Sequence, residues 1–372
     1  MMNNWHMEAP FGVVTAVTYK CNLKCKHCFA GSPELDNEAT VADMTTEQWK
    51  DLIHQLADMS VHEIYFGGGE PFIRRDMMEI ITEARRTGLG TTLTTNGTVI
   101  KEESIKQLAD LGVECVEVSI DGTQEIHDFL RGVPGAYQKS LQTIEWLDKY
   151  NIYVIASVTF SKENIPVSGQ IIREVTDAGV KEILFMRFVP CGIGRKYKER
   201  LYITEQEYRD AVVELLKKYE PEMKPEEMNK LNESNHFFKK SQAAYDGYFY
   251  PHAGCIAGRT YCFIRPNGDI TPCNPLSFPE HIAGNVTRQQ FADIWNNSPV
   301  LQKIRAIEHK DLPDCYTCSK AEMCAGGCRI MCHTYSGYCT NDCDNCSRTE
   351  SCNEASGLCG KKYMYYMRVN NA

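Results

Sequence analysis

Between residues 13 and 187, short runs of β-branched and apolar residues alternate with longer stretches in which apolar positions recur every three or four residues. This alternation is typical of strand–helix units repeated around a parallel sheet. It predicts six strands, at residues 13–18, 63–66, 91–95, 114–120, 153–159 and 182–187. It also predicts helices at residues 76–86, 102–111, 137–149 and 167–178, in addition to one that begins near Thr45.

The helix near Thr45 carries its own start signal. Thr45 can cap the helix and Gln48 can reach back to it, after which Trp49, Leu52 and Leu56 follow at helical spacing. Six strand–helix units are fewer than the eight that close a full barrel. The fold class is therefore predicted as α/β, a partial (βα)6 TIM-like barrel.

The pattern changes after residue 200. Residues 204–219 predict another capped amphipathic helix, and residues 220–249 are polar, charged and only partly periodic. Beyond Tyr250 the apolar periodicity weakens, which indicates a small cysteine-rich domain held together by iron-sulfur or zinc ligation. We therefore predict a barrel over residues 1–200, a helical bridge over residues 201–250 and an iron-sulfur domain over residues 251–372.

Composition narrows the range of partners. The 372 residues carry a formal net charge of -9, without a run of Lys and Arg that would suit nucleic acid or anionic lipid. The N-terminal residues do not read as an export signal, and no stretch approaches the roughly eighteen apolar residues of a membrane span. We expect a cytoplasmic protein with no nucleic-acid and no membrane partner. In that compartment eighteen cysteines indicate metal binding rather than disulfides.

The sequence TYKCNLKCKHCFAG places Cys21, Cys25 and Cys28 in a C-x3-C-x2-C spacing directly after the first predicted strand. Three thiolates can hold three corners of a cubane iron-sulfur cluster and leave the fourth iron open, whereas ferredoxins normally use four cysteines. The same spacing recurs at Cys339, Cys343 and Cys346, so spacing alone does not decide.

Three further loops follow the next three strands. They are Gly67-Gly68-Gly69-Glu70-Pro71, Thr95-Asn96-Gly97 and Ser119-Ile120-Asp121-Gly122. Each could be ordinary turn chemistry. In a βα barrel, however, the catalytic residues lie at the carboxyl ends of the strands. The backbone requirements of turns do not explain why all four loops lie at that edge of the sheet.

Together these residues resemble those of the radical S-adenosylmethionine (SAM) enzymes. The cysteine loop, with His27 before its third cysteine, is similar to that family's cluster motif, and residues 68–71 are similar to its GGEP segment. The resemblance implies that Cys21, Cys25 and Cys28 hold a 4Fe-4S cluster whose free iron is chelated by SAM.

The same resemblance implies the SAM contacts. Glu70 would face the methionine amino group, and Ser119 and Asp121 would approach the ribose or the carboxylate. Arg131 is a candidate partner for the SAM carboxylate, with a surface arginine as the alternative. The full implied set is Gly68, Gly69, Glu70, Thr95, Asn96, Ser119, Asp121 and Arg131.

The C-terminal cysteines are similar to the SPASM extension of that family, which holds two auxiliary 4Fe-4S clusters. The resemblance implies Cys255, Cys262, Cys273 and Cys328 for the first cluster, and Cys315, Cys318, Cys324 and Cys346 for the second. Zinc ribbons also use C-x2-C pairs, but eight thiols in this order fit them poorly. Tyr338 stands where such extensions usually carry Asp, and Cys343 could replace Cys346. Whether Cys339, Cys352 and Cys359 bind metal is left open.

The implied chemistry is reductive cleavage of SAM, followed by hydrogen abstraction from a substrate by a 5'-deoxyadenosyl radical. SPASM-bearing members mostly modify peptides, so a ribosomally made peptide or small protein is the expected substrate. Only twenty residues precede Cys21, too few for a peptide-binding domain. Recognition would then use a separate protein or a direct groove, and a flavodoxin or ferredoxin would supply electrons.

Three other functions are possible alternatives to a peptide maturase. Sulfatase-type maturases place Asp where this chain has Asn274. Enzymes acting on small molecules such as porphyrin side chains have a segment loosely like residues 189–195. A non-catalytic multi-cluster electron carrier would need no SAM site.

Overall fold

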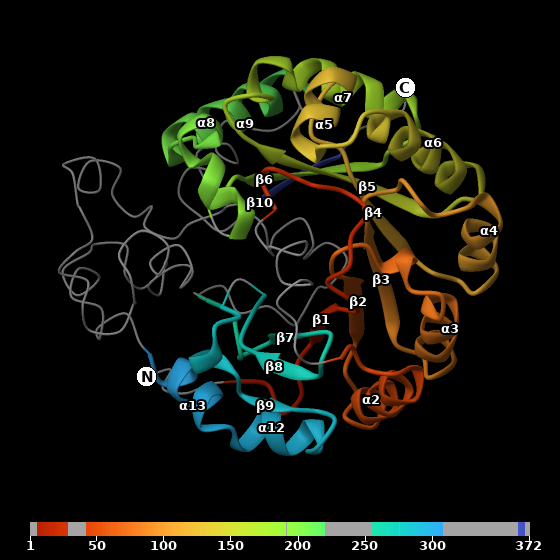
Figure 1. The fold of residues 1–372 in the computed structure, drawn as a ribbon, viewed down its shortest axis with the longest axis vertical. Coiled ribbons are helices and arrows are strands. Elements are labelled where there is room, and N and C mark those ends of the chain that lie inside the picture. The colour runs from red at the N-terminus through yellow and green to blue at the C-terminus, as the bar shows by residue number, and fades with distance from the viewer. Residues whose placement is uncertain are drawn as a thin grey trace.

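Six parallel strands, adjacent in space in the order in which they follow along the chain, form the centre of the molecule. The computed structural model describes residues 6–28, 42–190, 192–219, 255–274, 276–307 and 364–368. The sheet curves, with helices on its outer side (Figure 1), so the predicted partial α/β barrel is confirmed. The strands are β1 (Gly12–Ala16), β2 (Glu63–Gly67), β3 (Gly90–Thr95), β4 (Cys115–Ser119), β5 (Tyr153–Phe160) and β6 (Glu182–Arg187).

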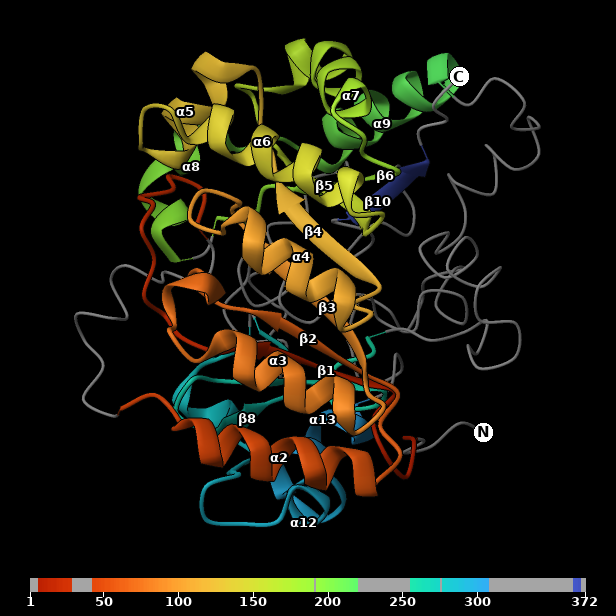
Figure 2. The ribbon, with the colours of Figure 1, turned by 90° about the vertical axis from the view of Figure 1, so that its right-hand side faces the viewer.

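The predicted helices are also present and follow one another along the outer face (Figure 2). They are α2 (Thr46–Asp58), α3 (Met77–Arg86), α4 (Glu102–Asp110), α6 (Ala136–Lys149), α7 (Ser168–Asp177) and α9 (Glu205–Tyr219). Two short helices were not predicted, α5 (Gln124–Arg131) and α8 (Lys198–Leu201), and neither were the 3-10 turns η1 (Pro71–Ile73), η2 (Ile165–Val167) and η3 (Gly192–Tyr197). Elements this short contain too few turns to show a helical period.

The C-terminal part of the chain extends the same sheet at both edges. Strand β7 pairs in parallel with β1, aligning Cys262 with Val13, and β10 pairs antiparallel with β6. The elements are β7 (Tyr261–Ile264), β8 (Asp269–Thr271), η4 (Pro279–His281), β9 (Gly284–Asn285), α12 (Phe291–Asn297), α13 (Pro299–Ala306) and β10 (Met364–Arg368). Strand pairing over such sequence distances leaves no local signal, and the sequence did not predict it.

One hydrophobic core runs through both parts. Trp49 of α2 and Phe66 of β2 belong to the same cluster of buried side chains as Ile264 of β7 and Phe291 and Trp295 of α12. The division at residues 200 and 250 stays a prediction, and residues 220–249 of the predicted bridge lie outside the described residues.

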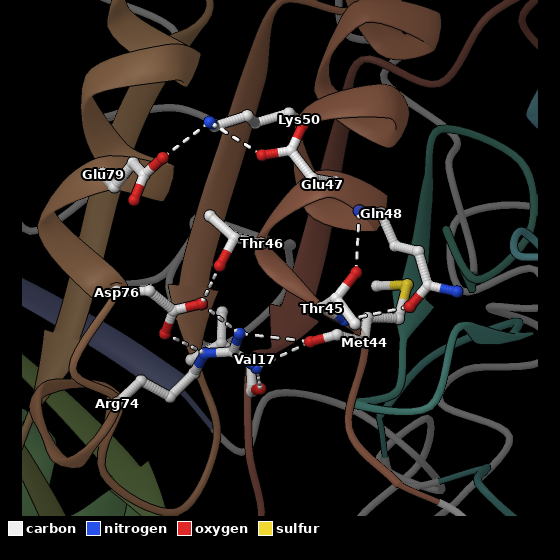
Figure 3. A network of polar contacts seen from close by, with 10 residues as sticks. All are labelled: Val17, Met44, Thr45, Thr46, Glu47, Gln48, Lys50, Arg74, Asp76 and Glu79. Atoms are coloured by element: carbon white, nitrogen blue, oxygen red, sulfur yellow. Dashed lines mark hydrogen bonds and ion pairs between the residues drawn. The ribbon is translucent and has the colours of Figure 1, made fainter.

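A network of polar contacts fixes the start of α2 next to the end of β1 (Figure 3). Thr45 and Gln48 form the predicted capping box. Arg74 donates to the carbonyls of Val17 and Met44 and forms an ion pair of 2.6 Å with Asp76. Val17 lies four residues before Cys21, so this network holds the strand from which the cysteine loop departs.

Candidate metal and cofactor site

The loops after β1 and β2 lie directly against each other. The backbone N–H of Gly69 donates to the carbonyl of Thr18 (2.8 Å), and that of Glu70 donates to the carbonyl of Lys20 (2.9 Å). A Cβ atom at Gly68 or Gly69 would clash with these carbonyls, and Gly68 has a φ of +135°. Both glycines are therefore required for the close approach of the GGEP segment to the cysteine loop.

Glu70 is a buried brace between the loops after β2 and β3. Its side chain is 0% exposed. One carboxylate oxygen accepts from Thr95 Oγ1 (2.8 Å) and the N–H of Phe72 (3.2 Å), and the other accepts from the N–H of Asn96 (2.8 Å). Burial outweighs these bonds and raises the pKa of Glu70 to about 7. Glu70, Thr95 and Asn96 therefore belong to one hydrogen-bond network centred on the Glu70 carboxylate.

The three cysteines of the first loop gather in a small apolar cluster with Leu23 and Ala136. Cys21 Sγ accepts from the N–H of Leu23 at 3.4 Å and lies 4.0 Å from Asn96 Nδ2. Burial raises the pKa of the Cys21 thiol and raises that of Cys25 to about 12. A bound metal reverses this preference, because its charge favours the thiolate.

A buried ion-pair network lies beside these thiols. Arg131 Nη2 is 2.5 Å from Asp121 Oδ2, and Arg131 Nη1 is 3.8 Å from Cys25 Sγ. His27 Nε2 is 3.2 Å from the same Asp121 oxygen. Burial alone would raise the pKa of Asp121, but Arg131 and His27 outweigh it and hold that pKa well below its usual range. Arg131 is only 9% exposed, so the alternative of a surface arginine is wrong.

Two residues that hold Asp121 in place were not found from the sequence. The N–H of Asp121 donates to His127 Nδ1 (3.1 Å), and Asn164 Nδ2 donates to the Asp121 carbonyl (2.8 Å). The carboxylate also accepts from the N–H of Thr159 (2.8 Å). His127 and Asn164 stand in no motif, and only the folded structure brings them to Asp121. Ser119 is half-buried at the end of β4, two residues before Asp121.

The described cysteines of the C-terminal part do not form one closed set. Cys255 and Cys273 are partly buried, whereas Cys262 is 1% exposed within the main core. Burial raises the pKa of the Cys262 thiol, and Arg305 is the charged group that opposes this. The remaining predicted ligands, Cys315, Cys318, Cys324, Cys328 and Cys346, lie outside the described residues, as do Cys339, Cys343, Cys352 and Cys359.

Comparison with known proteins decides the family. The radical SAM superfamily matches residues 15–166, and the SPASM iron-sulfur cluster-binding domain matches residues 255–319. An AdoMet-dependent heme synthase of Oleidesulfovibrio alaskensis is 31% identical over 334 residues, covering 86% of this chain and 83% of that protein. The chain belongs to the radical SAM superfamily. This radical SAM protein is also 28% identical over 326 residues to the mycofactocin maturase MftC of Mycobacterium tuberculosis (strain H37Rv), covering 87% of this chain and 79% of that protein.

Solved structures show the same fold. Streptococcus suis SuiB bound to the precursor peptide SuiA superposes with a TM-score of 0.68 at 19% identity, covering 92% of this chain and 77% of that chain. As a radical SAM protein with a SPASM domain, this chain uses SAM and iron-sulfur clusters. Within the described ranges, no helix combines the length and the apolarity needed to cross a bilayer.

The residues present fit the groups that the family uses. The buried guanidinium of Arg131 lies 3.8 Å from Cys25 Sγ, and that of Arg305 is held by the carbonyl of Gly258, in the turn between Cys255 and Cys262. Arg131 Nε and both terminal nitrogens of Arg305 are buried without a hydrogen-bond partner. Buried cations without full compensation are costly, so anionic thiolate clusters beside them would supply the missing charge.

Proposed function

We propose that this protein cleaves SAM reductively and abstracts a hydrogen atom from a ribosomally made peptide, forming a crosslink or rearranging backbone or side chain. The observation that carries the proposal is the gathering of Cys21, Cys25 and Cys28 at the end of β1, beside the Arg131–Asp121 ion pair. The glycine segment packed against that loop supports it.

The chain's own residues supply position and charge. Cys21, Cys25 and Cys28 would hold the cluster, which when bound supplies the electron that cleaves SAM. Gly68, Gly69, Thr95, Asn96, Ser119 and Arg131 remain the proposed SAM contacts. Glu70 and Asp121, both 0% exposed, would act by orienting the neighbouring backbone and Arg131. The apolar side chains of Leu23 and Ala136 would keep water from the thiols.

The inner face of the sheet supports a peptide substrate. Val116 and Val118 of β4 face the helices, so alternation turns Glu117 to the inner face. Glu63 and Glu182 are the first residues of β2 and β6, at the opposite edge of the sheet from the cysteine loop. Glu117, nearer to that loop, favours a neutral or cationic peptide over a tetrapyrrole with several carboxylates.

The relatives point to two substrate classes. MftC is named as a maturase, and SuiB was solved with its precursor peptide, which favours the peptide. The heme synthase, at 31% identity, favours a tetrapyrrole as the second candidate. Adding the candidate substrate to protein, SAM and dithionite tests both. We expect a short peptide encoded beside the gene to raise 5'-deoxyadenosine formation and to change mass, and an iron porphyrin with carboxylate side chains to do neither.

We further propose three 4Fe-4S clusters in a cytoplasmic enzyme that is reduced by a flavodoxin or ferredoxin and is assisted by a separate peptide-recognition protein or a direct groove. Cys255, Cys262, Cys273 and Cys328 would hold one auxiliary cluster, and Cys315, Cys318, Cys324 and Cys346 the other. Replacing Cys318 or Cys324 by Ala should lower soluble yield and iron content together. A Cys318→Ala protein with wild-type stability and iron would contradict this ligand scheme.

Replacing Cys21, Cys25 and Cys28 together by Ala tests the SAM site. The triple variant should form no 5'-deoxyadenosine with SAM and dithionite, yet keep its fold, because the main core does not include that loop. Its iron content should fall by about four of roughly twelve atoms per chain. Cys115→Ala, on β4, is the matched control and should change neither. Unchanged iron in the triple variant would refute the assignment.

A further inference from the structure

Arg305 is a buried cation with no anion beside it among the described residues. It lies on α13 with a side chain 2% exposed. Its Nε donates to the carbonyl of Gly258 (2.6 Å), and its guanidinium carbon lies 4.5 Å from the centre of the Trp295 ring. Its Nη1 and Nη2 have no hydrogen-bond partner. Four N–H bonds on these two atoms are thus removed from water without compensation.

The groups around Arg305 indicate which ligand could pair with its guanidinium. Burial lowers the pKa of Arg305 to about 10; the Cys262 thiolate acts against this shift, and the neighbouring Arg259 adds to it. Gly258, which accepts from Nε, lies between Cys255 and Cys262, and its own N–H contacts the carbonyl of Pro272 next to Cys273. The guanidinium is therefore fixed to the turn that carries the cysteines predicted for the first auxiliary cluster.

Leaving a charged group buried and unpaired is costly, so proteins rarely keep one without a partner. A fixed fork of N–H donors is well suited to sulfur ligands, and hydrogen bonds to the sulfurs of a cluster shift its reduction potential. Arg305, fixed to the carbonyl of Gly258 in the turn between Cys255 and Cys262, provides both the charge and the donors.

We propose that Arg305 is the counter-cation of the auxiliary cluster held by Cys255, Cys262 and Cys273, donating from Nη1 and Nη2 toward its sulfur atoms and raising its reduction potential. This rests on the proposed cluster ligands. Reduction adds one negative charge to the cluster, so the cation stabilises the reduced form more than the oxidised form. Arg305 is thus a positioning residue, which acts through the cluster.

The test is an EPR-monitored redox titration of the full-length reconstituted protein, repeated in the Cys21/Cys25/Cys28→Ala background so that auxiliary clusters alone contribute. Arg305→Gln removes the charge and keeps a side chain of similar shape. We expect the midpoint potential of one auxiliary cluster to fall by at least about 59 mV, which corresponds to a tenfold change in its one-electron reduction equilibrium. Arg305→Lys, which keeps the charge, should lie closer to wild type.

Arg288→Gln is the matched control, because Arg288 is exposed in the same part of the chain. An Arg305→Gln protein that loses iron while Arg305→Lys keeps it would also support the proposal, since charge would then decide assembly. Unchanged iron and midpoint in Arg305→Gln would overturn it, and so would equal losses in both variants, which would indicate packing on Trp295 alone. Wild-type protein with only about four irons per chain would instead refute the auxiliary clusters themselves.

Discussion

At the scale of single residues, the site depends on charges that are buried yet paired. Asp121 forms ion pairs with His27 and Arg131 and accepts from the N–H of Thr159, so its carboxylate stays ionised while 0% exposed. Removing one partner of such a group costs more than the pair contributes, because the remaining charge stays buried. The arrangement therefore fixes the loop after β4 in one position relative to the cysteine loop.

His127 makes this arrangement sensitive to acid. Burial, and then the charge of Arg131, lower its pKa to about 3. Between about pH 6.5 and pH 3 the unfolded chain binds a proton that the folded chain does not, so the free energy of unfolding falls as pH falls, by up to about 1.4 kcal/mol per pH unit. His127→Asn keeps an acceptor for the N–H of Asp121 and removes the titration. Urea midpoints from about pH 7 to about pH 5 should therefore decrease less in this variant than in wild type.

His62→Asn, at an exposed position, is the control for that experiment. If His127→Asn and wild type lose stability in parallel on acidification, the neutral buried form of His127 does not contribute to the acid response.

The sequence identifies several residues of the site, but it does not show which contacts they make. The cysteine loop, Glu70 and Asp121 could be picked out because motif and strand end coincide, whereas Arg131 was only a candidate implied by the family resemblance. That Glu70 braces Thr95 and Asn96 depends on contacts between residues about 25 positions apart. His127, Asn164 and Arg305 belong to no motif, and only the contacts of the folded structure point to their roles.

At the scale of elements, local patterns decide most of the barrel. The alternation of strand and helix periods predicted all six parallel strands, and they lie side by side in chain order, as parallel neighbours in a βα fold usually do. The prediction failed where no period exists, at the eight-residue α5, and where pairing is distant, at β7 on β1. Exact strand ends also escaped it: β1 ends at Ala16, because the chain then turns into the cysteine loop.

Arg74 connects three elements, so it should contribute more to the free energy of unfolding than a surface arginine does. Its side chain is 11% exposed and bonds the end of β1, the start of α2 and Asp76 before α3. Arg74→Lys keeps the charge but cannot reproduce the planar fork, so we expect a loss of about 2–4 kcal/mol in unfolding free energy. Thermal unfolding followed by circular dichroism measures it.

The neighbouring Arg75 is exposed and offers a matched control. Arg75→Lys should leave the unfolding temperature within about one degree, since exposed substitutions change stability by less than about 0.5 kcal/mol. Equal effects at the two positions would show that the network at Arg74 adds nothing to stability.

At the scale of the whole molecule, the barrel and the C-terminal part share one sheet and one core. Strand β7 covers the edge of β1, and the N–H of Phe291 donates to Gln55 of α2 (2.7 Å). Trp295 Nε1 donates to the carbonyl of Met7 (2.9 Å). The two family domains matched at residues 15–166 and 255–319 thus share one sheet and one hydrophobic core among the described residues.

This continuity predicts that the barrel does not fold without the C-terminal part. A chain ending at Tyr219 would uncover the edge of β1 and the apolar surfaces that Ile264, Phe291 and Trp295 bury. An uncovered strand edge next to exposed apolar surface favours aggregation. We therefore expect low soluble yield and no cooperative thermal transition by circular dichroism, even though all six barrel strands are present. Ile264→Ala in the full-length chain is the milder version and should cost about 2–5 kcal/mol without loss of folding. If the chain ending at Tyr219 were soluble and unfolded at the wild-type temperature, the barrel would be an independent unit, and the shared sheet would contribute no stability.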